Sequence, residues 1–210
     1  MTSTMIVAGS IDALLGALGD ALGDLVGEGS DVVLLPTAAA YVGATEAAVR
    51  TASALESLGS AVEALMVTDR ASANETYFAD RVRRADLCIL LDGSALHART
   101  TWRDSAVGDA LGDSHAIAAL GACATVLGTH MIDPRGGAPT TGLSLVDDAV
   151  FTVRASEDQL ARSRHLLGAH ETLIVIDADG CVIRRTDGWR QVSEGGVAAT
   201  RDGSPVRLAT

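Results

Sequence analysis

Short apolar runs alternate with amphipathic segments through the first two thirds of this 210-residue chain. The runs are rich in Val, Ile and Leu, which is typical of strands that are buried on both faces. They are Met5–Ala8, Asp31–Leu35, Ala61–Val67, Asp86–Leu91 and the run that starts at Ile117. Strands that alternate with helices form parallel sheets, with the helices packed on both faces. The order of segments therefore predicts a three-layer α/β fold with a mostly parallel sheet.

The segments between these runs carry apolar residues at spacings close to 3.6, which predicts helices. The expected helices are Ile11–Val26, Thr45–Leu58, Asn74–Arg84 and about Thr100–Leu111, with a further helix after the Ile117 run. No internal repeat, low-complexity tract or linker interrupts this pattern. We therefore expect residues 1–210 to form a single domain.

The pattern changes after Asp147, where strands come to dominate. Ser156–Leu167 is predicted to be a helix. The segments expected to be short antiparallel strands are Leu173–Asp177, Cys181–Arg185 and Gly196–Ala199. Asp-Gly pairs favour tight hairpin turns, and they occur at Asp179–Gly180, Asp187–Gly188 and Asp202–Gly203. We expect a hairpin-rich C-terminal region.

The charge and cysteine content restrict the function and location. The formal net charge is −11, with acidic residues spread along the chain; nucleic acids and anionic membranes need clustered positive charge, so neither is expected as a partner. Three isolated cysteines without CxxC spacing are typical of reduced cytoplasmic thiols. His130 with Asp133 offers too few ligands for zinc. We expect a soluble cytoplasmic protein without a cofactor or metal.

The segment Ile117–Gly128, IAALGACATVLG, has the pattern of a catalytic turn. Hydrolases use a strand, a tight turn of small residues and a helix to expose a nucleophilic side chain. Here the turn contains Gly121, Ala122, Cys123 and Ala124, and the segment has no Ser. Ligand sites in parallel sheets lie beyond the carboxyl ends of the strands. The loops after Leu35 and Leu91, the Gly121 turn and the loop near Asp148 are therefore expected to gather at one site.

Those four loops carry a family resemblance over nearly the whole chain. VVLLPTAAA (Val32–Ala40) resembles a strand that ends in Pro-Thr-Ala, and ADLCILLDGSAL (Ala85–Leu96) resembles AD-x-IFFTGGDQ. HAIAALGACATVLG (His115–Gly128) resembles AVIAGTSAGAAVLG without a gap, and DAVF-x-x-R (Asp148–Arg154) resembles DQHF-x-x-R. The chain thus resembles the cyanophycinase and dipeptidase E family of serine peptidases. The resemblance implies their flavodoxin-like, class I glutamine amidotransferase-like fold.

The same register replaces the catalytic residues of that family. The nucleophilic Ser falls on Gly121, the catalytic His on Val150 and the substrate-contacting Gln on Ala95. The first Gly of the GGDQ loop becomes Asp92. A serine peptidase needs a hydroxyl and a base within hydrogen-bond reach, and neither Gly nor Val supplies one. The resemblance therefore implies a catalytically degenerate member that binds a ligand or a partner protein, with a homodimer as one expected assembly.

Some of the family's ligand-binding features remain. Asp148 and Arg154 match family positions, and the resemblance assigns Arg154 to a cluster that binds substrate carboxylate; its other two arginines fall on Ser156 and Gln159. Backbone amides can also donate to a carbonyl or carboxylate, so the remaining candidate ligand-binding residues are Gly93, Ser94, Gly121 and Ala122. We expect an acidic or peptide-like ligand. Asp92 either repels such a ligand or forms a turn before Gly93, and the sequence leaves both interpretations open.

A second hypothesis restores an enzyme through Cys123. A shift of two residues makes Gly121–Thr125 a small-x-nucleophile-x-small turn, as in Cys-dependent amidotransferases. His170, which precedes Glu171, or His97 would then be the base. Residual peptidase activity on aspartyl or β-aspartyl peptides is a third possibility. Glycine at the tip of the turn would favour the degenerate member, and cysteine there would favour the Cys enzyme.

Overall fold

The central sheet places five parallel strands side by side. The computed structural model describes residues 4–17, 23, 25–133, 139–153, 156–167 and 171–210. The sheet has the order β11-β10-β1-β5-β4-β2-β3. Its parallel strands are β1 (Thr4–Ala8), β2 (Asp31–Leu35), β3 (Ala61–Ala64), β4 (Leu87–Leu90) and β5 (Ala116–Leu120). Two antiparallel strands, β10 (Cys181–Arg185) and β11 (Gly188–Gln191), extend the sheet beyond β1.

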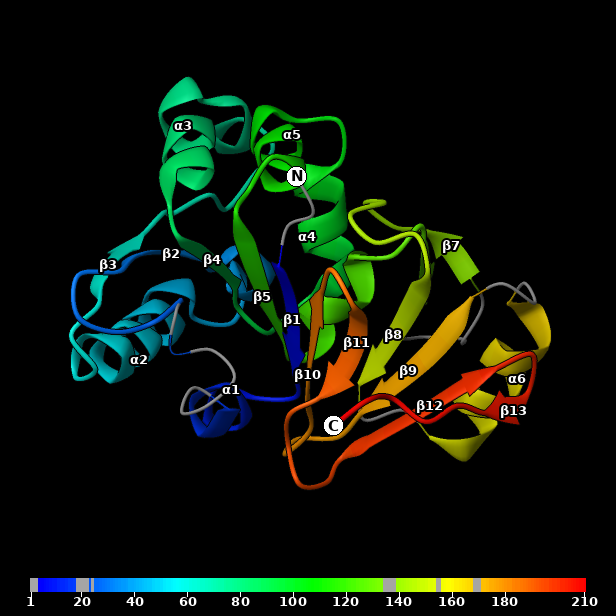
Figure 1. Ribbon diagram of the computed structural model, residues 1–210. Helices are drawn as coiled ribbons and strands as arrows, with labels where there is room; N and C mark the ends of the chain where they lie inside the picture. The colour runs from blue at the N-terminus through cyan, green and yellow to red at the C-terminus, as the bar shows by residue number, and fades with distance from the viewer. Residues whose placement is uncertain (1–3, 18–22, 24, 134–138, 154–155, 168–170) are drawn as a thin grey trace.

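Helices cover both faces of this sheet (Figure 1). Side chains alternate across a strand, so Ile6 of β1 packs with α1 (Ile11–Ala17) and α2 (Ala44–Glu56). Its neighbour Met5 packs in the opposite core. That core contains residues of α3 (Thr76–Arg84), α4 (Ala95–Trp102) and α5 (Ala106–Gly112). The predicted three-layer α/β fold is confirmed. Within the described ranges, no helix combines the length and apolar content needed to cross a membrane.

A second, smaller sheet lies beside the central one. Its order is β13-β12-β9-β8, and its strands are β8 (Ala149–Val153), β9 (Thr172–Ile176), β12 (Val197–Arg201) and β13 (Ser204–Pro205). The helix α6 (Glu157–Leu166) connects the parallel strands β8 and β9. A separate two-stranded ribbon pairs β6 (His130–Ile132) with β7 (Pro139–Thr141). Phe151 of β8 contacts Trp189 of β11 edge to face, with ring centroids 5.1 Å apart.

One of the three predicted hairpins is wrong. Asp187–Gly188 joins the paired strands β10 and β11, and Asp202–Gly203 joins β12 and β13, as expected. Asp179–Gly180 instead connects strands of different sheets, because β9 pairs with β8 and β12 whereas β10 pairs with β1. Both β9 and β10 are largely buried. Each strand therefore satisfies its backbone groups within a separate sheet, and the Asp-Gly turn only changes the direction of the chain.

The predicted helix Thr100–Leu111 is also wrong. Helix α4 ends at Trp102, and α5 begins at Ala106. Asp104 between them has a left-handed φ of 54°, and Ser105 caps α5 by accepting a hydrogen bond from the Gly108 amide at 3.1 Å. Capping side chains compete with helix continuation. The break leaves the Trp102 side chain fully buried between the sheet and the helices.

Other boundaries differ less. Of the helix predicted over Ile11–Val26, the structure describes α1 as helical. Residues 25–29 form turns, and residues 18–22 and 24 lie outside the described ranges. The predicted helix after β5 is the 3₁₀ helix η3 (Gly121–Val126). The Asn74–Arg84 prediction divides into the 3₁₀ helix η2 (Ser72–Asn74) and α3. These changes leave the carboxyl ends of the parallel strands where they were predicted.

Candidate functional site

Three of the four expected loops meet at the carboxyl edge of the central sheet. They follow β2, which leads into the 3₁₀ helix η1 (Thr37–Ala39), β4 and β5. The Ser94 amide donates a hydrogen bond to the Ala38 carbonyl oxygen at 2.7 Å, which joins the first two loops. The Ala122 amide donates to Oδ1 of Asp92 at 2.7 Å, which joins the second and third. One backbone hydrogen bond and one bond to the Asp92 side chain therefore hold the three loops together.

Gly121 forms the tip of the turn after β5. It is buried and has a left-handed φ of 54°, a conformation that favours glycine. In strand–turn–helix hydrolases, the nucleophile occupies this strained position between strand and helix. The structure thus places Gly121 at the tip, as the ungapped resemblance implied, and Cys123 two residues further into η3.

The Asp92 carboxylate fills the space that a side chain at position 121 would need. A Cβ atom built on Gly121 would lie 2.1 Å from Cγ of Asp92 and 2.3 Å from each of its two carboxylate oxygens. Such separations are far shorter than the ordinary van der Waals contact of about 3.5–4.0 Å. A side chain at position 121 and the present Asp92 conformation therefore exclude each other.

Asp92 also occupies two backbone hydrogen-bond donors, one from the turn and one from its own loop. Its Oδ1 accepts from the Ala122 amide at 2.7 Å and from the Gly93 amide at 2.8 Å. In hydrolases with a nucleophile elbow, the amide after the nucleophile and an amide from another loop bind the developing oxyanion. Ala122 follows the tip residue, and Gly93 belongs to the neighbouring loop. The exposed Asp92 thus places its own carboxylate on a donor pair of the kind that binds an oxyanion.

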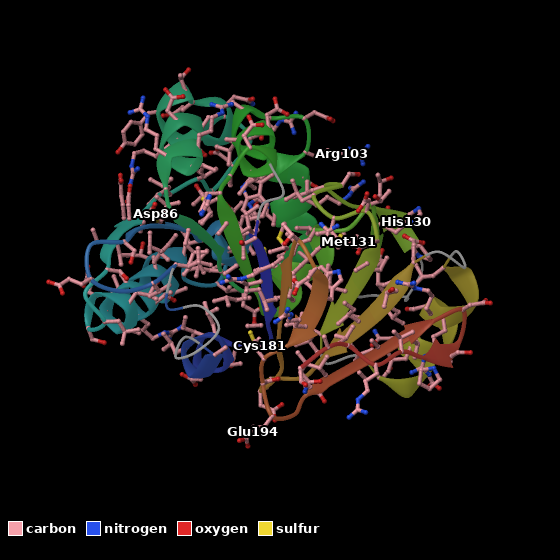
Figure 2. All side chains as sticks on the ribbon, viewed as in Figure 1. Asp86, Arg103, His130, Met131, Cys181 and Glu194 are labelled. Carbon is pink, nitrogen blue, oxygen red and sulfur yellow. The ribbon has the colours of Figure 1, made fainter. Side chains whose placement is uncertain are left out.

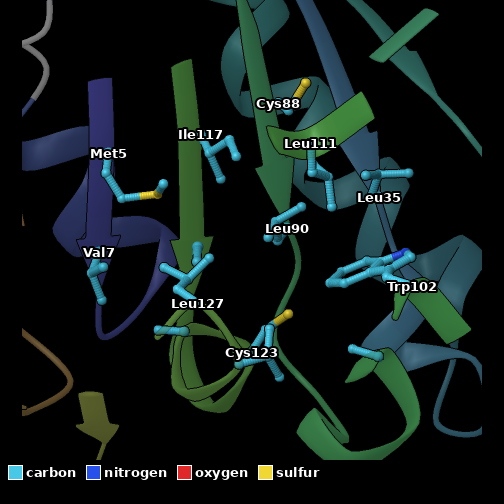
Figure 3. Close-up of a cluster of buried hydrophobic side chains, with 14 of the residues drawn as sticks. Met5, Val7, Leu35, Cys88, Leu90, Trp102, Leu111, Ile117, Cys123 and Leu127 are labelled. Carbon is cyan, nitrogen blue, oxygen red and sulfur yellow. The ribbon is translucent and has the colours of Figure 1, made fainter. Parts of the chain in front are cut away.

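Cys123 is part of the hydrophobic core. Its side chain is fully buried with those of Leu90 and Leu127 (Figure 3). Burial raises the pKa of the Cys123 thiol far above its usual value, and the nearby Asp92 carboxylate raises it further. Only the thiolate is an effective nucleophile. The position and environment of Cys123 are therefore those of a structural thiol.

His97, one of the two proposed bases, is engaged by other residues. The His97 ring forms a 2.8 Å hydrogen bond through Nε2 with the Thr68 carbonyl and contacts the Tyr41 ring at a centroid distance of 4.7 Å. His170 lies outside the described residues. His97 thus links α4 to the neighbouring loops.

Native protein is expected to resist thiol modification. Cys88, Cys123 and Cys181 are all buried, and burial raises the pKa of Cys88 and Cys181 to about 12. Iodoacetamide at neutral pH should label all three slowly in native protein and rapidly after denaturation, as measured by intact mass. A Cys123→Ala variant identifies the contribution of that thiol. Rapid labelling of native protein that disappears in this variant would contradict the assignment of Cys123 to the core.

Two other substituted positions also lack catalytic groups. Val150 is fully buried in an apolar cluster with Ile132, Leu160 and Leu173. Ala95 is the first residue of α4 and is almost completely buried. Neither side chain can accept or donate a proton. Ser94 caps α4, since its Oγ accepts a hydrogen bond from the His97 amide at 3.3 Å.

The expectation that Asp148 joins the other loops is wrong. Asp148 precedes β8, and its Oδ1 accepts a 3.3 Å hydrogen bond from Nε1 of Trp189 and lies 3.7 Å from Nε of Arg184. The opposite end of β8, Thr152–Val153, lines a pocket of about 290 Å³ with Gly93. Strand direction explains the error, because a residue before a strand lies a strand length from the residue after it. Arg154 lies outside the described residues.

His115 and His130 lie elsewhere in the molecule. His115 is exposed before β5, at the opposite end of that strand from Gly121. His130 lies on the side of the molecule away from α2 (Figure 2), and its Nδ1 is 2.6 Å from Oε1 of Glu171. Among the residues that the structure describes, no three His, Cys, Asp or Glu side chains form a group that could hold a metal ion.

A cleft of about 1040 Å³ opens beside Asp92. It lies at the carboxyl ends of β1, β2, β4 and β5, and its walls come from α1, α2 and the loops at this edge. Its charged lining residues are Asp12, Glu46, Arg50 and Asp92. Of the residues that line this cleft, only Asp92 and Gly93 were among the candidate ligand-binding residues. The positions of Asp12, Glu46 and Arg50 in predicted helices near strand ends were the available signal for the rest.

Solved structures with this fold include peptidases. A peptidase from an acI-B1 Actinobacterium gives a TM-score of 0.76 at 18% identity, over 100% of this chain and 95% of that chain. A protein provisionally named peptidase E from Listeria monocytogenes EGD-e gives 0.63 at 15% identity, over 96% and 99%. No protein-family model and no curated protein matches the chain. These similarities confirm the fold over essentially its whole length.

Proposed function

We propose that this chain has a peptidase E-like fold but binds its ligand without cleaving it. The observation that carries the proposal is the Asp92 carboxylate, which takes the space of a side chain at position 121 and binds the amides of Gly93 and Ala122. A substrate carbonyl would have to displace Asp92 to reach those donors. Even then, Gly121 has no hydroxyl group that could attack the carbonyl carbon.

The losses at the site reinforce each other. The position of the expected base is filled by Val150, which lies in an apolar cluster. Loss of the nucleophile or the base alone lowers the rate of a triad enzyme by several orders of magnitude, and the effects are not additive. A Cys-dependent enzyme is disfavoured because the Cys123 thiol is fully buried. Ligand binding is the activity that this edge of the sheet still supports.

Hydrolysis assays test the proposal directly. Purified protein should release no amino acid from aspartyl dipeptides or from β-aspartyl-arginine above the rate of a buffer blank, while an active peptidase E assayed in parallel cleaves its substrate. Asp92→Ala and Cys123→Ala variants control for contaminating peptidases, because the hydrolysis rate of a contaminant does not change with these substitutions. Turnover that either substitution abolishes would overturn the proposal.

A further inference from the structure

The cleft beside Asp92 is lined by two helices that pack over different strands of the sheet. Helix α1 packs near β1 and β10, and α2 packs near β2 and β3. The two strands between them in the sheet are β5 and β4. Neighbouring strands lie about 4.8 Å apart, so this arrangement separates the helices by more than the width of a strand pair. Figure 1 shows α1 and α2 as separate bodies on this face. The cleft opens above the carboxyl ends of the central strands.

The lining of the cleft is largely apolar. Aliphatic residues of four elements or their adjoining loops contribute to it, among them Ile11 and Leu15, Ala47 and Ala54, Leu91, and Leu120. Small-molecule sites combine such surfaces with a few polar groups that orient the ligand, and typically enclose about 300–1000 Å³. In open parallel sheets, ligands bind beyond the carboxyl ends of the strands. Both the place and the lining therefore favour a small organic ligand.

The charges in the cleft favour a cation. Among the described residues, the cleft is lined by three carboxylates, those of Asp12, Glu46 and Asp92, and by one guanidinium, that of Arg50. Asp12 and Glu46 lie in the first turns of α1 and α2, where acidic residues stabilise a helix dipole. Asp92 adds its charge at the edge of the central strands. The net charge of −11 also attracts a cation toward the chain.

An anionic ligand would meet two obstacles here. The Gly93 and Ala122 amides already donate to Asp92, so they are engaged in the present conformation. A carboxylate placed beside them would also lie next to the Asp92 carboxylate, and like charges in contact cost binding energy. The acidic ligand expected from the sequence therefore fits this cleft less well than a basic one.

We infer that the cleft binds an organic cation, with an ammonium or guanidinium head near Asp92 and an apolar tail along the aliphatic lining. This inference rests on the proposed function, since it assigns a ligand class to the same non-hydrolytic site. Asp92 supplies the charge that recognises the head, and its hydrogen bonds with the two amides fix the carboxylate in place.

Three probes with one alkyl chain isolate the charge: n-hexylamine, protonated at pH 7, 1-hexanol and hexanoate. Ligand-observed NMR titration should show the tightest binding for hexylammonium, weaker binding for hexanol and none for hexanoate. Added salt should weaken hexylammonium binding, because it screens charge. Equal binding of hexanoate and hexylammonium, or no binding of hexylammonium, would overturn the inference.

Substitutions test which residues of the cleft bind the cationic head and which bind the alkyl chain. Asp92→Asn keeps an amide oxygen for the two backbone donors and removes the charge, so hexylammonium affinity should fall about tenfold or more. Glu75→Gln, an equal charge change at an exposed position before α3 and outside the cleft, should leave it unchanged. Ala47→Phe should block the apolar lining and abolish binding of hexanol as well. Unchanged affinity in Asp92→Asn would overturn the role of Asp92. Peptide turnover would contradict the proposed function instead, so the two failures are distinguishable.

Discussion

A Gly121→Ser variant is expected to lose about 3 kcal/mol of folding stability and to gain no peptidase activity. Two costs combine in this estimate. A left-handed φ costs a non-glycine residue about 1–2 kcal/mol, and Gly121 has a φ of 54°. The new Cβ would also lie 2.1 Å from Cγ of Asp92, so the exposed carboxylate must turn away and lose its hydrogen bonds with the Gly93 and Ala122 amides, which costs about 1–3 kcal/mol. Urea unfolding measures the loss.

A double-mutant cycle separates the two costs. In an Asp92→Ala background the steric conflict is absent, so Gly121→Ser should cost about 1–2 kcal/mol less than in the native background. Gly29→Ser is the matched control, since Gly29 also has a left-handed φ, 83°, but no atom within 4 Å of an added Cβ. It should show only the conformational cost, in either background. Strict additivity of Asp92→Ala and Gly121→Ser would mean that the two positions do not compete for space.

A Gly93→Ala variant is expected to lose at least about 3 kcal/mol, because the obstacle there is backbone. A Cβ on Gly93 would lie 2.2 Å from the Ala38 carbonyl oxygen and 2.8 Å from the Ala39 nitrogen, at a φ of 151°. Neither atom can move without shifting the loop after β2. Overpacking and backbone strain each cost about 1–3 kcal/mol. The change should also separate the Gly93 amide from Asp92, which amide chemical shifts would report.

Gly188→Ala provides the control for backbone conformation. Gly188 has a positive φ of 107°, and nothing lies within 4 Å of its added Cβ. It should therefore lose only the conformational cost, about 1–2 kcal/mol. If both alanine variants are destabilised equally, the Ala38 backbone presents no steric obstacle to a side chain at position 93. Thermal unfolding of the two variants under the same conditions makes the comparison.

The layers of the fold follow from local patterns in the sequence. Runs such as Asp31–Leu35 and the one starting at Ile117 have the uniform apolar character of strands buried on both faces, and they form β2 and β5. The second sheet was harder to foresee. The strands β9 and β10 are separated by only a short turn, but β10 joins β1 across most of the chain whereas β9 joins β8. Sequence alone does not assign such long-range pairings.

The candidate site was predicted in part. The register of the resemblance placed glycine at the tip of the turn, and the structure has Gly121 there. The sequence left open whether Asp92 forms a turn or repels ligands. The answer depends on the contact between Asp92 and Gly121, which are 29 positions apart and follow the neighbouring strands β4 and β5. The cleft was not predicted. It depends on the separation of α1 and α2 in space, which the pattern of apolar residues does not encode.

The competition between Asp92 and position 121 also makes the effect of one substitution depend on whether the other is already present. A chain of this fold that carries Asp92 with Gly121 can exchange them for a small residue and a serine by two routes. The route that introduces serine first passes through a protein with a side chain forced against a carboxylate. The route that first removes Asp92 keeps the tip free of conflict at every step. A serine at position 121 is therefore expected to be tolerated better after Asp92 has been replaced by a small residue than before.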